Sequence, residues 1–188
     1  MSHVSNVTEL RAPFLMVAMP QLQDPNFHHG VVLILEHNPK GSMGLVLNRP
    51  TTLSMATFCV SQKMPCKKNP MDLIFQGGPV HTDRAFILHA SSHKGPETEP
   101  VFEDIQLSYS LESLTLLTET PPELMRVFLG YAGWGADQLS EEIAEGSWLV
   151  TEPTSDFIFK MKHDALWNGV LESMGVHPMQ LVHSGKMH

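Results

Sequence analysis

The stretch from Met125 to Gln138, MRVFLGYAGWGADQ, constrains the fold more than any other part of this 188-residue chain. Its apolar first half has the length and composition of a buried strand. Three glycines that permit a tight turn follow: Gly130, Gly133 and Gly135. Tyr131 and Trp134 lie among them, each a large apolar side chain with one polar atom. The stretch predicts a strand that turns into a helix at a tight corner, which either packs internally or holds a ligand.

Short apolar runs and amphipathic segments alternate along the rest of the chain, which predicts one α+β domain over residues 1–188. Strands are expected at residues 14–19, 31–35, 45–47, 73–75, 85–90, 101–107 and 148–151. Helices are expected after the capping residues Thr52, Ser110 and Asp164, and at residues 136–145. The turn at 38–41 predicts a β-hairpin. Residues 156–161 fit a strand or a helical turn equally, and the last dozen residues are expected to fray.

The composition is that of a globular protein, with 42% hydrophobic and 17% charged residues. The formal net charge of −8 has the wrong sign for neutralising phosphates, which disfavours direct nucleic-acid binding. No apolar run approaches the roughly 18 residues of a membrane span, and the N-terminal sequence lacks a secretory pattern. We therefore expect a cytoplasmic protein that does not bind membranes.

Four polar clusters fall at predicted strand ends or turns, where they can converge in space. Their candidate binding residues are Glu36, His37, Asn38, Asn48, Arg49, Gly77, Gly78, Asp83, Arg84, Tyr131, Gly133, Trp134, Gly135 and Gln138. In a functional interpretation, Arg49 and Arg84 hold an anionic ligand, and His37 or Asp83 moves protons. In a structural interpretation, Asp83 and Arg84 form an ion pair and the glycines only shape turns.

No cofactor or metal is predicted. The eleven histidines lack metal-ligand spacing, and His89, at the end of a predicted strand, is expected to be a hydrogen-bonded core residue. The chain has no nucleophile elbow, P-loop or dinucleotide motif. Cys59 and Cys66 lie seven positions apart, which indicates neither a disulfide framework nor a zinc site. Cys66, beside two lysines, could sense oxidants, although a loop cysteine without a partner is more often incidental.

Four motifs together resemble the AlgH/YqgE family of uncharacterised bacterial proteins. They are APFLMVAMPQLQDPNF, EHNPKGSMGLVLNRP, GGPVHTDRAFILH and LGYAGWGADQLSEEI, the last followed by SWL. The resemblance covers residues 12 to 175. It implies a single α+β domain, with a largely antiparallel sheet curled into a pseudo-barrel and flanked by helices. One branch of the family is named as a transcriptional regulator of alginate synthesis, but no settled reaction comes with the family.

Two functions remain open from the sequence. The favoured one is a non-enzymatic cytoplasmic binding or regulatory protein that uses these turns to hold a small ligand or a protein partner. The alternative is an enzyme of unassigned class, in which Glu36, His37, Asp83 and Arg84 carry the chemistry.

Overall fold

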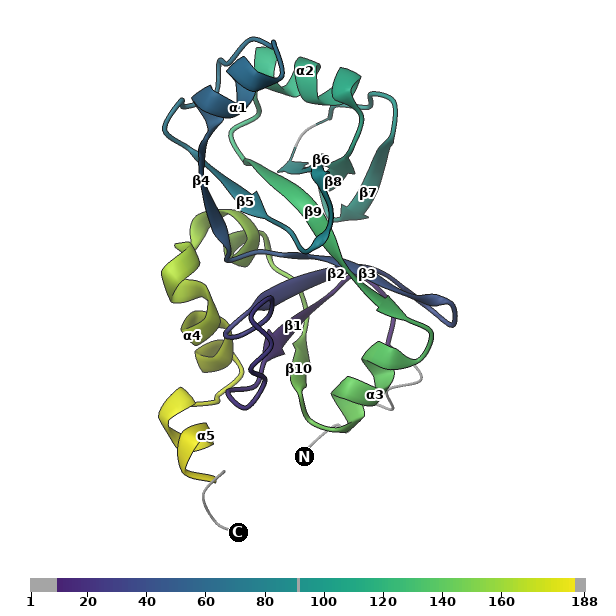
Figure 1. The fold of residues 1–188 in the computed structure, drawn as a ribbon, viewed down its shortest axis with the longest axis vertical. Helices are drawn as coiled ribbons and strands as arrows, with labels where there is room; N and C mark the ends of the chain where they lie inside the picture. The colour runs from purple at the N-terminus through teal and green to yellow at the C-terminus, as the bar shows by residue number, and fades with distance from the viewer. Residues whose placement is uncertain (1–9, 91, 185–188) are drawn as a thin grey trace. The chain divides into compact units, whose positions relative to one another are not determined.

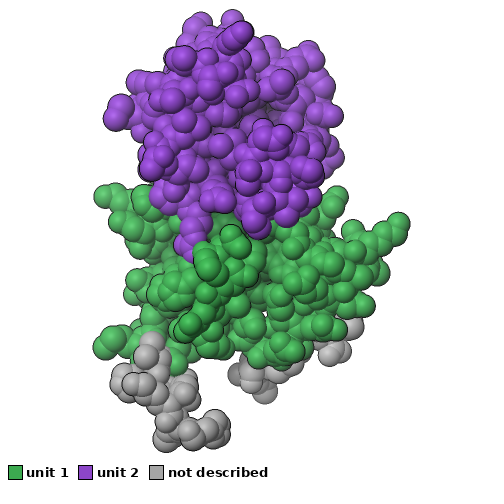
Figure 2. All heavy atoms as spheres, viewed as in Figure 1, with its two compact units in different colours: residues 1–48, 132–188 green, residues 49–131 purple. Residues whose placement is uncertain are grey.

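The chain divides into two compact units in the computed structural model, which describes residues 10–90 and 92–184. Unit 1 consists of residues 1–48 and 132–188, and unit 2 consists of residues 49–131 (Figure 2). The strand β9 (Met125–Gly135) contributes its first seven residues to unit 2 and its last four to unit 1. The expectation that residues 1–188 form a single domain stays a prediction.

Unit 1 contains five antiparallel strands in the order β10-β1-β2-β3-β9 (Figure 1). They are β10 (Trp148–Thr151), β1 (Phe14–Ala18), β2 (Val31–Asn38), β3 (Gly41–Val46) and the end of β9. The helices of this unit are α3 (Gln138–Ala144), α4 (His163–Ser173), α5 (Pro178–Ser184) and the π-helical turn η2 (Asp156–Lys160). Every residue of β1 is buried: Phe14, Met16 and Ala18 pack in an apolar core cluster, helix α4 contacts the strand, and neighbouring strands pair with both of its edges.

Unit 2 pairs its strands in the order β4-β5-β9-β6-β8-β7, and only the β5–β9 pair is parallel. The strands are β4 (Pro50–Ser54), β5 (Leu73–Gln76), β6 (Val80–Ala90), β7 (Thr98–Phe102) and β8 (Ile105–Ser108). The helices α1 (Met55–Ser61) and α2 (Leu111–Glu119) lie next to each other (Figure 1) and share one apolar core cluster with β5, β6 and β9.

Several predicted elements are confirmed. The hairpin of β2 and β3 turns at residues 39 and 40, where the Asn38 side chain accepts a hydrogen bond from the Lys40 backbone at 2.9 Å. Ser110 caps α2 by accepting a hydrogen bond from the Ser113 backbone. The α+β class with a largely antiparallel sheet and flanking helices is also confirmed.

Other boundaries were wrong for reasons that depend on tertiary pairing. Ser54, not Thr52, caps α1, because β4 continues to Ser54 and pairs with β5. Lys162 occupies the N-cap position of α4, and Asp164 lies in its first turn. The expected edge strand at 101–107 is a hairpin of β7 and β8, which turns at residues 103 and 104.

Two further corrections concern the end of β9 and the C-terminal dozen. Residues 130–135 continue the strand instead of forming a turn, because residues 132–135 pair with β3. The last dozen residues were expected to fray, but residues 178–184 form the helix α5. Residues 185–188 lie outside the described residues. The ambiguous segment at 156–161 is the helical turn η2. Of the predicted polar lead-in at 1–11, residues 1–9 also lie outside the described part.

Candidate functional site

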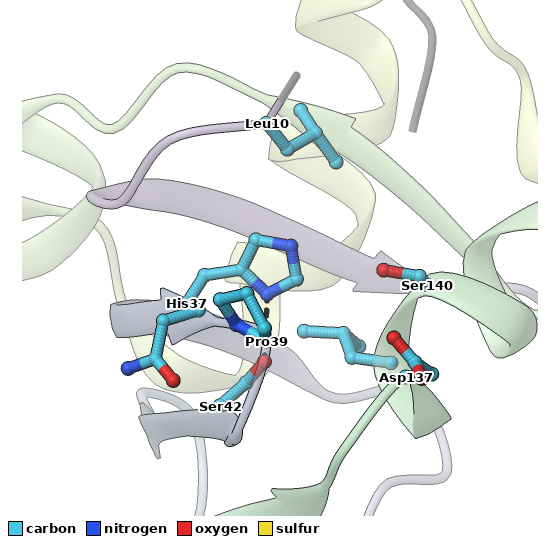
Figure 3. A pocket seen from close by; sticks show the side chains of 8 residues that line it. Leu10, His37, Pro39, Ser42, Asp137 and Ser140 are labelled. Carbon is cyan, nitrogen blue, oxygen red and sulfur yellow. Dashed lines mark hydrogen bonds between the residues drawn. The ribbon is translucent and has the colours of Figure 1, made fainter. Parts of the chain in front are cut away.

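A cavity of about 230 Å³ opens in unit 1 between the β2–β3 hairpin and the start of α3 (Figure 3). Its polar lining residues are His37, Asn38, Ser42, Asp137 and Ser140. Leu10, Pro39 and Leu139 supply the apolar part of the wall. Two predicted binding residues, His37 and Asn38, therefore share a cavity with the residues that directly follow β9.

His37 is held in a fixed orientation at one side of the cavity. It lies directly opposite Ser42 in the hairpin register, and its Nδ1 is 2.7 Å from the Ser42 hydroxyl. The ring also meets Phe14 edge to face, with centroids 5.6 Å apart. Figure 3 shows the other ring nitrogen, Nε2, on the opposite edge of the imidazole, where it makes no hydrogen bond with any described residue. One nitrogen thus positions the ring, and among the described residues the other has no hydrogen-bond partner.

Asp137 and Ser140 lie across the cavity from His37 (Figure 3). Asp137 occupies the N-cap position of α3 with a left-handed backbone, φ 63°, and its carboxylate makes no capping hydrogen bond. Gln138 instead accepts a hydrogen bond from the Gly135 backbone at 3.0 Å, which fixes the corner between β9 and α3. The Asp137 carboxylate is therefore exposed at the cavity and does not cap the helix.

Next to this corner, the Glu142 carboxylate is hydrogen-bonded to two tryptophans, an interaction that the sequence did not predict. Its Oε2 accepts hydrogen bonds from the indole nitrogens of Trp134 at 3.1 Å and Trp148 at 2.9 Å. Its Oε1 accepts a third from Gln138 at 3.1 Å, and Phe27 stacks on Trp134. Trp134 and Gln138, predicted as binding residues, thus support the cavity wall from behind. The i, i+4 spacing of Gln138 and Glu142 was the only local signal for this network.

Replacing Glu142 with alanine is expected to lower the free energy of unfolding by about 2 kcal/mol, because two indole donors lose a charged acceptor. Urea unfolding followed by tryptophan fluorescence measures the change. Glu141→Ala, one position away with an exposed side chain, is the matched control and should cost less than about 0.5 kcal/mol. Equal losses in the two variants would show that the indole contacts do not stabilise unit 1.

In unit 2, the GGPVHTDR segment meets the first half of the glycine-rich stretch. The Gly77 backbone donates to Leu129 O at 2.8 Å, and Val80 pairs with Tyr131. The register then shifts, so residues 81–84 leave the ladder with exposed side chains before pairing resumes at Ala85. The Tyr131 ring is 6.0 Å from that of His81. Two of the four predicted polar clusters, the GGPVHTDR segment and the first half of the glycine-rich stretch, therefore lie next to each other.

Asp83 and Arg84 line a second cavity of about 240 Å³ in unit 2, together with Tyr109. The side chains of Asp83 and Arg84, both of which the structure describes, form no ion pair with each other, so the ion pair of the structural interpretation is absent. Tyr109 donates a hydrogen bond to Glu99 at 2.9 Å, and this bond, with burial, raises the tyrosine pKa.

The remaining predicted residues lie outside both cavities. The buried Asn48 side chain is hydrogen-bonded to backbone groups: its Oδ1 accepts from Val31 N at 3.0 Å and its Nδ2 donates to His29 O at 2.9 Å.

Arg49 lines neither cavity, so it does not share the second cavity with Arg84. Burial lowers the pKa of Arg49. Glu36 is exposed on β2, and Gly133 pairs with Met43 of β3. Gly78 is buried.

His89 is fully buried and its Nε2 is 2.8 Å from the Ser108 hydroxyl, which confirms the expected core histidine.

Across residues 10–90 and 92–184, no three His, Cys, Asp or Glu side chains lie close enough together to hold a metal ion, and the lack of a metal stays a prediction. None of the helices in this part of the chain combines the length and apolar character needed to cross a bilayer.

A protein-family model described as AlgH-like matches residues 15–179. A "UPF0301 protein" of Myxococcus xanthus (strain DK1622) is 42% identical over 172 residues, covering 91% of this chain and 94% of the relative. A "UPF0301 protein" of Thioalkalivibrio sulfidiphilus (strain HL-EbGR7) is 40% identical over 164 residues, covering 86% and 88%. Neither name states a reaction, so these relatives support a family without an assigned activity.

Solved structures agree with the sequence matches. The solution structure of the AlgH protein from Pseudomonas aeruginosa is similar with a TM-score of 0.74 and 32% identity, covering 100% of this chain and 98% of that one. A crystal structure of a protein from Corynebacterium diphtheriae shares the fold, with a TM-score of 0.69 at 21% identity. The predicted curled, largely antiparallel sheet is thereby confirmed, as is the resemblance that suggested it. The chain belongs to the AlgH-like family.

Proposed function

We propose that the protein acts in the cytoplasm as a non-enzymatic binding protein with a regulatory role, and that the cavity of unit 1 holds its small-molecule ligand. The observation that supports this proposal is the cavity itself, with five polar side chains around an apolar wall. At about 230 Å³ it is smaller than the roughly 300–1,000 Å³ of drug-sized sites, which favours a small metabolite-sized ligand.

The charges and hydrogen-bonding groups of the cavity narrow the class of ligand. Among the lining residues that the structure describes, Asp137 is the only carboxylate or permanent charge, so an anionic ligand is disfavoured. An amine or a neutral amide would place a donor on Asp137, and a hydroxyl or carbonyl group could bond to Nε2 of His37. Leu10 and Leu139 leave room for a short apolar portion. The proposed ligand is therefore a small amine or amide with a second polar group.

A thermal-shift screen of small amines, amino alcohols and amides tests the proposal. A ligand present at a hundred times its Kd should stabilise the folded protein by about 2.7 kcal/mol. Asp137→Asn keeps a residue that tolerates the left-handed backbone and removes the charge, so it should weaken binding of a cationic hit about 10- to 100-fold. Glu141→Gln, on the exposed side of α3, is the matched control and should bind normally.

Two results would contradict this assignment. A hit that binds Asp137→Asn and His37→Ala as tightly as the parent protein does not occupy the cavity. A protein that co-purifies in stoichiometric amount, and is lost only in these two variants, would instead assign the cavity to a protein partner.

A second candidate function, an enzyme, is favoured by one specific contact. The 2.7 Å separation between His37 Nδ1 and Ser42 Oγ is that of a general base and a nucleophile. Ser42 is only 8% exposed, which restricts substrate access to the hydroxyl. A fluorophosphonate probe separates the two functions: the binding proposal expects no labelling, whereas labelling of Ser42 that disappears in His37→Ala would support acyl transfer.

A further inference from the structure

Cys59 and Cys66 are the two cysteines of the chain, and the fold of unit 2 brings their side chains together. Cys59 lies on α1 and Cys66 in the loop that leads to β5, yet both pack against the same apolar core cluster. The neighbouring Cys66 contributes to raising the pKa of Cys59, as two side chains close to each other do. Seven positions of sequence separation gave no sign of this contact, because it depends on how the helix ends.

The end of α1 reverses the chain. Met64 N donates to Cys59 O at 3.0 Å, and Lys63 N donates to Val60 O at 3.1 Å. Lys63 has a left-handed backbone, φ 54°. These two bonds and the left-handed residue form a Schellman motif, the usual closure of a helix C-terminus. The residues that follow therefore return along the last turn of α1, and Cys66 packs against the apolar cluster that contains Cys59.

The loop is also fastened beyond Cys66. Lys67 N donates to Thr118 O of α2 at 3.1 Å, and the Cys66 sulfur is 3.7 Å from Lys68 O. With backbone hydrogen bonds on both sides of Cys66, the two thiols are kept near each other. Bond formation between them would close a short loop at the end of α1.

The two thiols differ in their access to solvent. Cys59 is 1% exposed, whereas Cys66 is half-buried. Burial, together with the neighbouring Cys66, raises the pKa of Cys59 to about 12, so Cys59 keeps its proton at neutral pH. A reagent that arrives from solvent therefore meets Cys66 first, with Cys59 behind it.

We propose that Cys59 and Cys66 form a reversible intramolecular disulfide when the protein meets a peroxide, which makes the end of α1 an oxidant-responsive modification site. The Cys66 sulfur attacks one oxygen of hydrogen peroxide, the O–O bond breaks, and the departing oxygen leaves as water. Cys59 then attacks the sulfenic acid, the S–O bond breaks, and the departing hydroxide takes the Cys59 proton as a second water. Both sulfurs are oxidised, and one peroxide is reduced to two waters.

Intact-mass spectrometry of the full chain tests the proposal. Reduced protein is treated with a stoichiometric amount of hydrogen peroxide, denatured and reacted with N-ethylmaleimide. The expected product has lost two hydrogens and takes up no maleimide, and its proteolytic map contains a Cys59–Cys66 peptide. Dithiothreitol should restore both thiols. Cys59→Ala should instead trap Cys66 as a sulfenic acid that reacts with dimedone, and Cys66→Ser should keep one unmodified thiol.

Three results would overturn the proposal. The treated protein would take up two maleimides, or its disulfides would join different chains on a non-reducing gel, or Cys66 would react with dimedone equally in the parent protein and in Cys59→Ala. The first and second measurements need no variant, so a folding defect in Cys59→Ala would leave the test intact.

Discussion

Replacing Gly130 with alanine is expected to lower the free energy of unfolding by about 4 kcal/mol, because the added methyl group would meet both backbone strain and fixed backbone atoms. Gly130 has a φ of 70°, a conformation that L-residues with a Cβ adopt at a cost. A Cβ there would also lie 2.5 Å from Gly78 O and 2.9 Å from Val80 O, which are backbone atoms of the adjoining GGPV segment. Neither atom can rotate away as the end of a side chain could.

A second glycine separates the two causes of this loss. Gly146 has a φ of 81°, but a Cβ there would meet no heavy atom within 4 Å. Gly146→Ala should therefore cost only about 1 kcal/mol, the backbone contribution alone. Urea unfolding of both variants measures the difference. If Gly130→Ala costs no more than Gly146→Ala, the close approach of the GGPV backbone does not constrain this position.

Acidification from about pH 6.5 to about pH 4 is expected to remove about 3 kcal/mol of stability through His89 alone. Burial, with a smaller contribution from the charge of His93, lowers the His89 pKa from 6.5 to about 4. In this pH range the unfolded chain binds a proton at His89 and the folded chain does not. The free energy of unfolding therefore falls as the pH falls through this window, and the contribution is fully present above pH 6.5.

The slope of stability against pH is the quantity to measure, because carboxylates add a background that all variants share. His89→Gln should flatten the slope between pH 6.5 and pH 4, whatever its effect on stability at neutral pH. His177→Gln, at an exposed histidine, should leave the slope unchanged. An NMR titration of His89 in the parent protein gives a second reading, and a pKa near 6.5 would contradict the prediction.

Local chemistry predicted those elements whose signals lie within a few residues. The β2–β3 hairpin follows from the Asn38–Gly41 turn, and the start of α2 follows from Ser110. Thr52 and Ser54 are both good N-caps, however, and only the pairing of Ser54 with Leu73 of β5 decides between them. That choice rests on a partner far along the chain, which no local pattern contains.

The candidate site was predictable in part for the same reason. His37 and Asn38 were identified because a polar cluster at a strand end is unusual, and both line the unit 1 cavity. Glu142 was missed, since its partners Trp134 and Trp148 become visible only when β9, α3 and β10 are assembled. Trp134 was selected for its indole nitrogen, which the structure shows to be bonded to that carboxylate.

The division of β9 between the units bears on how the protein is made. Unit 2 is one uninterrupted segment, so all of its strands have left the ribosome once Tyr131 has. Unit 1 must wait longer, because β3 pairs with residues 132–135 and β1 pairs with β10, whose last residue is Thr151. The strands β1, β2 and β3 are thus synthesised first but lack two neighbours until late. We expect the middle of the chain to be native while the apolar beginning still depends on chaperones.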